Sequence, residues 1–269
     1  MQTETRDCRH GRIIYLPNDV FIGRALQTYG EWAEGEVAIF RQLLKPGHFA
    51  VDAGANIGVL TLGMATLVGP QGRVHAFEPQ VVLHDLLCRN VALNGHANVV
   101  AHRMAAGAAA GTRHVPPLDY DRPGNFGGVQ LGGEEGDAVP VATVDGLELP
   151  RLDLIKADVE GMELDVIKGA RESIARFQPA IYVENDRREK SQALIVAILD
   201  LGYRLWWHIT PLFNPDNFFG HREDVFGNRV SCNMLGLPPT AARRVALPEI
   251  TSPLDTAVEP DGSIRITRR

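Results

Sequence analysis

Short apolar segments alternate with longer segments of helical spacing along most of this chain, and that alternation predicts an α/β fold. Strands separated by helices pair in parallel, so we expect a mostly parallel sheet with helices on both faces. The 269 residues are 45% hydrophobic and 22% charged, a composition typical of a globular protein that buries a full core. No repeat and no clear internal boundary is visible, which predicts a single domain over residues 1–269.

The first half of the sheet is expected from three strand-like segments and the two helices between them. Apolar runs at 48–54, 72–79 and 98–105 predict the strands. The segment 57–69 is apolar and long enough for a helix, and in 81–95 the apolar residues recur along one helical face. These five elements form two consecutive strand–helix–strand units.

The second half repeats the same alternation. Strands are predicted at 151–161 and 179–186, with a helix over 162–177 between them. The segment 186–202 begins with an aspartate and has a glutamate three positions later, a capping-box arrangement that predicts the start of another helix.

Three stretches fall outside this alternation. A short N-terminal extension covers about 1–35, and a C-terminal tail covers about 238–269, where GSIRITR is expected to pair as a strand. Residues 111–137 are rich in glycine and proline and too long for an ordinary connection. A loop of that length is expected to be an inserted hairpin, a lid or a disordered segment.

Composition excludes several classes of protein. The formal charge of −6 argues against a nucleic-acid groove, which needs a basic face. No run of about 18 apolar residues is present, so neither a membrane partner nor a membrane span is expected, and a cytoplasmic protein is predicted. Cys8, Cys88 and Cys232 are too far apart for a disulfide framework or a metal knuckle. A small-molecule or glycan partner fits better, and a homo-oligomer stays open.

The segment VDAGANIGVL joins an acid at a strand end to a glycine turn. A dinucleotide site would carry a third glycine where Asn56 stands, and Asp52 would repel a pyrophosphate but attract an ammonium group. Glu78 ends the next strand, where a carboxylate accepts hydrogen bonds from a ribose diol. Adenosine joined to an amino acid satisfies both acids, so the predicted ligand is S-adenosylmethionine; a simple helix cap is the plainer alternative. The candidate donor-binding residues are Asp52, Gly54, Ala55, Asn56, Gly58, Glu78 and Pro79.

Three motifs carry a family resemblance. LLKPGHFAVDAGANIG, AFEPQ and especially DLIKADVEGMELDVIKGA resemble the FkbM family of S-adenosylmethionine-dependent methyltransferases, over about Glu31 to Gly236. The resemblance implies a Rossmann-like sheet of seven strands, the class I methyltransferase fold, and O-methylation of a sugar, glycan or secondary metabolite. Ala157 departs from the family pattern, which often has a larger apolar residue there. The acceptor is not identified by the resemblance.

The third motif supplies the candidate catalytic acid. Asp158 follows the fourth strand, and Gly161 permits an immediate turn, so Asp158 is expected to face the transferred methyl as a base or as a positioning group. His208 ranks second as the base, because imidazole titrates near neutral pH. Lys156 is interpreted either as an electrostatic neighbour of Asp158 or, in the preferred interpretation, as a strand residue whose ammonium reaches solvent.

A magnesium site is an alternative that we do not favour. Asp158, Glu184 and Asn185 end neighbouring strands and could offer three oxygen ligands, by analogy with catechol-type methyltransferases. We favour a site without metal, in which Glu184 takes part in catalysis through a hydrogen bond to the acceptor.

Polar residues near the same sheet edge are candidate acceptor contacts. These are Glu160, Asn185, Asn217, Tyr120 and Asn125. The aromatic cluster of Trp206, Trp207 and Phe213 is interpreted as core packing. Three other functions remain as alternatives: an N-methyltransferase acting on a small molecule, a non-catalytic S-adenosylmethionine-binding module, and a nicotinamide oxidoreductase, which the missing glycine disfavours.

Overall fold

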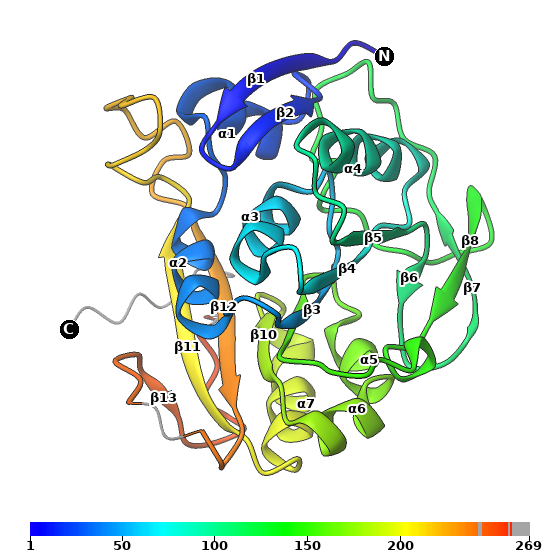
Figure 1. Ribbon diagram of the computed structural model, residues 1–269, viewed down its shortest axis with the longest axis vertical. Helices are drawn as coiled ribbons and strands as arrows, with labels where there is room; N and C mark the ends of the chain where they lie inside the picture. The colour runs from blue at the N-terminus through cyan, green and yellow to red at the C-terminus, as the bar shows by residue number, and fades with distance from the viewer. Residues whose placement is uncertain (242–243, 258, 260–269) are drawn as a thin grey trace.

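The computed structural model describes residues 1–241, 244–257 and 259. Its centre is an eight-stranded sheet with the order β13-β11-β12-β10-β9-β3-β4-β5 (Figure 1). Strands β10, β9, β3, β4 and β5 run parallel, whereas β12 and β11 add antiparallel pairings. The bounds are β3 Phe49–Ala53, β4 Arg73–Phe77, β5 Val99–His102, β9 Leu154–Ala157, β10 Ala180–Glu184, β11 Arg204–Pro211, β12 Val230–Leu237 and β13 Glu249–Ile250.

The predicted α/β fold with a mostly parallel sheet is confirmed, but the count of seven strands is one short. The eighth strand, β13, has only two residues and pairs with β11 at the sheet edge. So short a strand leaves no alternation in the sequence from which it could be predicted. The expected strand at GSIRITR lies outside the described residues.

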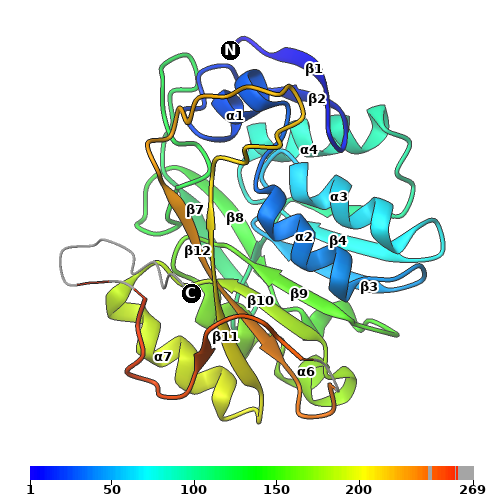
Figure 2. The ribbon, with the colours of Figure 1, turned by 90° about the vertical axis from the view of Figure 1, so that its left-hand side faces the viewer.

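Helices cover both faces of the sheet, as expected. Figure 2 shows α2 and α3 on one side of the strands and α7 on the other. On the first side Phe40 of α2 packs edge-on against Tyr182 of β10, and on the other Val166 of α5 and Ile195 of α7 join Ile155 of β9 in the largest core cluster. The helices are α1 Ile22–Tyr29, α2 Glu34–Leu43, α3 Val59–Val68, α4 Val81–Leu93, α5 Glu163–Lys168, α6 Arg171–Phe177 and α7 Arg188–Leu199.

Two helix predictions need correction. The helix expected over 162–177 is split into α5 and α6 at Gly169, where a Cβ atom would come within 2.0 Å of a backbone carbonyl oxygen. The carboxylate of Asp145, from a short 3-10 turn (Asp145–Leu147), accepts the backbone N–H groups of Glu172 and Ser173 and so caps α6. The capping box expected at 186 is absent, because α7 begins at Arg188 without a side-chain cap.

The N-terminal segment, defined here as residues 1–43, is folded onto the sheet domain. Its hairpin, β1 (Glu4–Cys8) and β2 (Gly11–Tyr15), lies against α4 at one end of the molecule (Figure 1). Asn90 of α4 and Asn94, the residue directly after α4, fix the hairpin, since their side chains exchange hydrogen bonds with the backbone of β2.

The glycine- and proline-rich insertion contains a hairpin. Strands β7 (Gly111–Val115) and β8 (Asp137–Ala142) pair antiparallel, and β6 (Ala105–Ala106) joins β8. The loop between β7 and β8 returns to the N-terminal segment, where the N–H of Val20 donates to the carbonyl of Gly124. No helix in the described part of the chain is both long and apolar enough to cross a membrane.

Candidate active site

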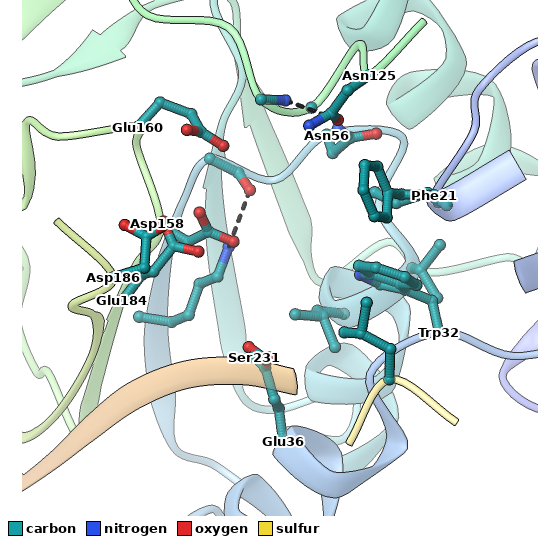
Figure 3. Close-up of a pocket in the computed structure, with 18 of the residues that line it drawn as sticks. Phe21, Trp32, Glu36, Asn56, Asn125, Asp158, Glu160, Glu184, Asp186 and Ser231 are labelled. Atoms are coloured by element: carbon teal, nitrogen blue, oxygen red, sulfur yellow. Dashed lines mark hydrogen bonds and ion pairs between the residues drawn. The ribbon is translucent and has the colours of Figure 1, made fainter. Parts of the chain in front are cut away.

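A cavity of about 550 Å³ opens at the carboxyl ends of β3, β4, β9 and β10. Ligands of open α/β sheets bind at this edge. Acidic side chains that follow β9 and β10 lie on one side of the cavity, and Phe21 and Trp32 of the N-terminal segment lie on the other (Figure 3). The cavity therefore has one wall from the sheet and one from the chain that precedes it.

The turn after β3 is built around a glycine that no other residue can replace without strain. Gly54 has φ +80°, and a Cβ atom there would come within 1.7 Å of the carbonyl oxygen of Asp158. The turn brings the backbone of Gly54, Ala55 and Asn56 to the cavity wall, as predicted. Gly58 has φ 92° and precedes the first residue of α3, so it allows the turn although it does not line the cavity itself.

Glu78 connects the ends of the first two predicted strands. Its carboxylate accepts the backbone N–H of Asn56 at 2.9 Å and that of Gln80 at 2.9 Å. Burial raises the pKa of Glu78 to about 7, against the lowering effect of these two hydrogen bonds. On its far side a narrow slot is lined by Phe77, Pro79, Met104 and Leu131, and Glu78 lines both this slot and the main cavity.

Asp52 lies beneath the cavity floor. It has no exposed surface, accepts the hydroxyl of Thr61 at 2.6 Å, and pairs with the ammonium of Lys156 at 3.1 Å. It does not line the cavity, and Lys156 does. A direct contact between Asp52 and an ammonium group of the ligand is therefore not what this arrangement offers.

The interpretation of Lys156 as a strand residue whose ammonium reaches solvent is wrong. The residue is 2% exposed, and its ammonium also donates to the carbonyl of Gly54 at 2.8 Å. Burial lowers the pKa of Lys156, but the charges of Asp52, Asp158 and Glu36 outweigh burial and raise it overall. Lys156 is therefore charged, and it gives the cavity floor a fixed cation.

The acids after β9 and β10 converge. Strand β9 ends at Ala157 and the chain turns at once, with Glu160 at φ 56°, so Asp158 and Glu160 both face the cavity. Glu160 is paired with Arg187, which holds its carboxylate. Glu184 at the end of β10 completes the group, and carboxylate oxygens of Asp158, Glu160 and Glu184 lie within 4.8 Å of one another. Burial, followed by the charge of Asp158, raises the pKa of Glu184 well above its usual range.

The magnesium ligand set considered from sequence is not the set that assembles. The amide of Asn185 is turned into the core, where it donates to the sulfur of Met234 at 3.1 Å. Glu160 takes its place beside Asp158 and Glu184. Three carboxylates offer the hard oxygen ligands that a divalent cation prefers, although exposed acidic groups also gather without one.

Several other predicted site residues lie away from the cavity. Tyr182 and His208 share a hydrogen bond of 2.7 Å in the sheet, and burial lowers the pKa of His208 to about 4. Asn217 is buried within its own loop, bonded to His221 and Asn214. Tyr120 donates to the side chain of Gln80. None of His208, Asn185, Asn217 and Tyr120 lines the cavity, whereas Asn125 does.

Some of the cavity residues missed from sequence come from the N-terminal segment, and others come from the loops and strands around β11 and β12, such as Leu212 and Val230. Phe21, Trp32 and Glu36 belong to no recognisable motif. One signal was available for Glu36, which shares the apolar face of α2 with Val37 and Phe40. An acid at such a position needs a partner or a function.

The fold and the position of the cavity are those expected of a Rossmann-like methyltransferase, and comparisons with known proteins identify the family. The model of the methyltransferase FkbM domain matches residues 52–205. Methyltransferase sdnD of Sordaria araneosa is 34% identical over 194 residues, which cover 58% of this chain and 73% of that protein. Methyltransferase 1 of Beauveria bassiana is 30% identical over 145 residues, 45% of this chain and 57% of that protein.

Two solved structures are similar at lower identity. Methyltransferase FkbM from Methylobacillus flagellatus has 19% identity and a TM-score of 0.44, over 74% of this chain and 50% of that one. An S-adenosylmethionine-dependent O-methyltransferase from Thermotoga maritima has 15% identity and a TM-score of 0.48, over 90% of this chain and 79% of that one. Because the family model matches residues 52–205, more than half of the chain, the chain belongs to the FkbM methyltransferase family.

Proposed function

We propose that the protein transfers the methyl group of S-adenosylmethionine to a hydroxyl oxygen of a sugar, a glycan or a secondary metabolite. The observation that carries this proposal is the position of Glu78, a buried carboxylate between a narrow slot and the main cavity. S-adenosylmethionine placed there would have its adenine in the slot, its ribose diol on Glu78 and its methionine part in the cavity.

The described residues fit this donor. Phe77, Met104 and Leu131 give the slot the apolar walls that suit an adenine ring. The turn at Gly54 has no room for a side chain, so its backbone can approach a bound ligand closely. When bound, the donor supplies a methyl group already activated by its sulfonium. The carboxylates of Asp158, Glu160 and Glu184 would attract the positive charge of this sulfonium, which supports binding of the donor.

Asp158 is the residue that we assign to the acceptor hydroxyl. Its side chain is 40% exposed, follows β9, and has a carboxylate oxygen 3.9 Å from the ammonium of Lys156. That position favours a group that orients a hydroxyl toward the methyl or takes its proton. The net charge of −6 supports a small acceptor in place of a nucleic acid.

An amine is the second candidate acceptor. The convergence of Asp158, Glu160 and Glu184 would attract a protonated amine to the cavity, which supports N-methylation of a small molecule. A hydroxyl is preferred because an amine bound by carboxylates keeps its proton, and the protonated form is not a nucleophile.

Donor binding and product mass test the proposal. We expect S-adenosylmethionine to raise the unfolding temperature of the protein, and mass spectrometry to find hydroxylated glycosides that gain one methyl group. Donor binding without methylation of any alcohol, glycoside or amine would favour a non-catalytic binding module. Methylation of amines alone would favour the second candidate.

A further inference from the structure

Glu36 is a buried carboxyl that the methyltransferase motifs do not include. It is 6% exposed, lies on α2, and lines the cavity from the side of the N-terminal segment. Its helix is held in place by Phe40, one turn later, which packs edge-on against Tyr182 at 5.1 Å between ring centres. The carboxyl is therefore fixed by the core and not by a mobile loop.

One oxygen of Glu36 is anchored and the other is left for a ligand. The hydroxyl of Ser231 donates to Oε1 at 2.8 Å, and the amide of Asn233 donates to the same oxygen at 3.1 Å. Asn233 also donates to the hydroxyl of Ser231 at 2.7 Å, so the two donors hold each other in place. Among the described residues, no hydrogen bond goes to Oε2 of this cavity-lining carboxyl.

The charged and titratable groups around Glu36 come from three strands. Lys156 of β9 and Asp158, which directly follows β9, face it, and Tyr182 of β10 lies nearby with its hydroxyl bonded to His208 of β11. Burial and then the charge of Asp158 raise the pKa of Glu36 to about 7, while Ser231, Lys156 and Asn233 act in the opposite direction. A carboxyl balanced in this way exchanges protons near neutral pH.

Beside Glu36 the cavity wall is largely apolar. Phe21 and Trp32 of the N-terminal segment are joined there by Leu60, Leu212 and Val230, and the guanidinium of Arg229 lies 5.3 Å from the centre of the Phe21 ring. These aromatic side chains face the acidic group across the cavity (Figure 3). Such a wall suits the apolar face of a hydroxylated ring. The acids that line the cavity outnumber its cations, Lys156 and Arg229, which disfavours an acceptor with negative charge.

We propose that Glu36 is the base of the reaction and takes the proton of a hydroxyl on an uncharged ring packed against Phe21 and Trp32. The hydroxyl oxygen forms a bond to the methyl carbon as the carbon–sulfur bond breaks, and the bonding electrons go to sulfur. The hydroxyl proton goes to Oε2 of Glu36. This inference rests on the proposed O-methylation and leaves Asp158 the role of orienting the hydroxyl.

The first test compares Glu36→Gln with wild type at saturating donor, on the uncharged p-nitrophenyl glycoside that wild type methylates fastest. The amide keeps the shape and an acceptor oxygen for Ser231, so we expect turnover to fall about a hundredfold with donor affinity unchanged. The fall of wild-type turnover below about pH 7 should disappear in the variant. Glu34→Gln is the matched control, because Glu34 lies on the same helix, outside the cavity and paired with His10 and Arg41.

The second test needs no turnover. Carboxyl carbon NMR of donor-free protein with labelled glutamate should show several signals that titrate near pH 7, those of Glu78 and Glu160 among them, and one of these signals should be absent from Glu36→Gln. Ser231→Ala removes a hydrogen bond that lowers the pKa of Glu36, so this titration and the acidic limb of turnover should both move to higher pH.

The outcomes separate the two proposals. Absence of wild-type methylation of every hydroxyl acceptor contradicts the proposed function. Wild-type methylation that persists in Glu36→Gln, with an unchanged pH profile, contradicts only the role of Glu36. A folded variant is shown by its unchanged donor affinity in calorimetry.

Discussion

The two walls of the cavity differ in how the sequence builds them. The sheet wall comes from strand ends and the turns that follow them. Gly54 is fixed there by its close approach to the backbone of Asp158, and Glu78 by the N–H of Asn56 at the end of the neighbouring strand. The opposite wall includes Phe21, Trp32 and Glu36, which reach the cavity only through tertiary packing. The proposed donor side is thus specified locally, and the proposed acceptor side depends on how the N-terminal segment docks.

The largest expected effect separates chemistry from donor binding on the sheet wall. Asp158→Asn keeps the shape of the side chain and removes its charge, so turnover should fall roughly a hundredfold or more while donor affinity stays nearly unchanged. Steady-state kinetics with calorimetry checks this. Asp165→Asn, at a partly exposed site on α5, is the control. Near-normal turnover in Asp158→Asn would remove this residue from the reaction.

The next effect concerns donor affinity alone. Glu78→Ala removes the carboxylate assigned to the ribose diol and should weaken donor binding by about 1.5 to 3 kcal/mol, roughly ten to a hundredfold. Calorimetry measures the change directly, with Asp85→Ala on the exposed face of α4 as the control. Equal affinities for Glu78→Ala and wild type would refute the assignment.

A smaller effect should appear in the stability of the donor-free protein. The pKa of Glu78 is raised to about 7 by burial, so its neutral form is favoured in the folded state. The resulting stability is present at low pH and is lost as pH rises from about 4.5 through about 7. We expect the free energy of unfolding of wild type, minus that of Glu78→Gln, to decrease over this range in urea titrations. A difference independent of pH would show that Glu78 ionises normally.

The smallest expected effect is that of metal removal. Asp158, Glu160 and Glu184 form a compact acidic group, but Glu160 is already paired with Arg187. A chelator should therefore change turnover little, and added magnesium should not raise it. If activity is lost in chelator and recovered in magnesium, the three carboxylates form a metal site and the reaction depends on the metal.

The sequence predicted the sheet wall because its signals are local. Glycines after a predicted strand and an acid after the next strand predict that Gly54, Asn56 and Glu78 lie together, and all three line the cavity. The same logic failed for Asn185, since a strand-end position does not decide which face a side chain takes, and for His208, which lies within β11 and not at its end. Asp52 was placed at the right strand end, but its pairing with Lys156 depends on packing between strands.

The other wall could not be read from sequence. Nothing near Phe21 or Trp32 distinguishes a cavity residue from a core residue, because both kinds are large and apolar. Their position depends on the hairpin that Asn90 and Asn94 anchor to α4 and on the loop where Asn214 and Phe218 bond to Glu31. These contacts join residues far apart in the chain.

The docking of the N-terminal segment has a consequence for how such enzymes diversify. Backbone hydrogen bonds from two asparagine side chains attach the hairpin to α4, and such bonds do not depend on which side chains the hairpin carries. The hairpin can therefore vary in sequence while it stays attached, whereas Phe21 and Trp32 are held by packing against Phe226. We expect exchange of the whole N-terminal segment between homologues to change the substrate preference and to leave the sheet intact.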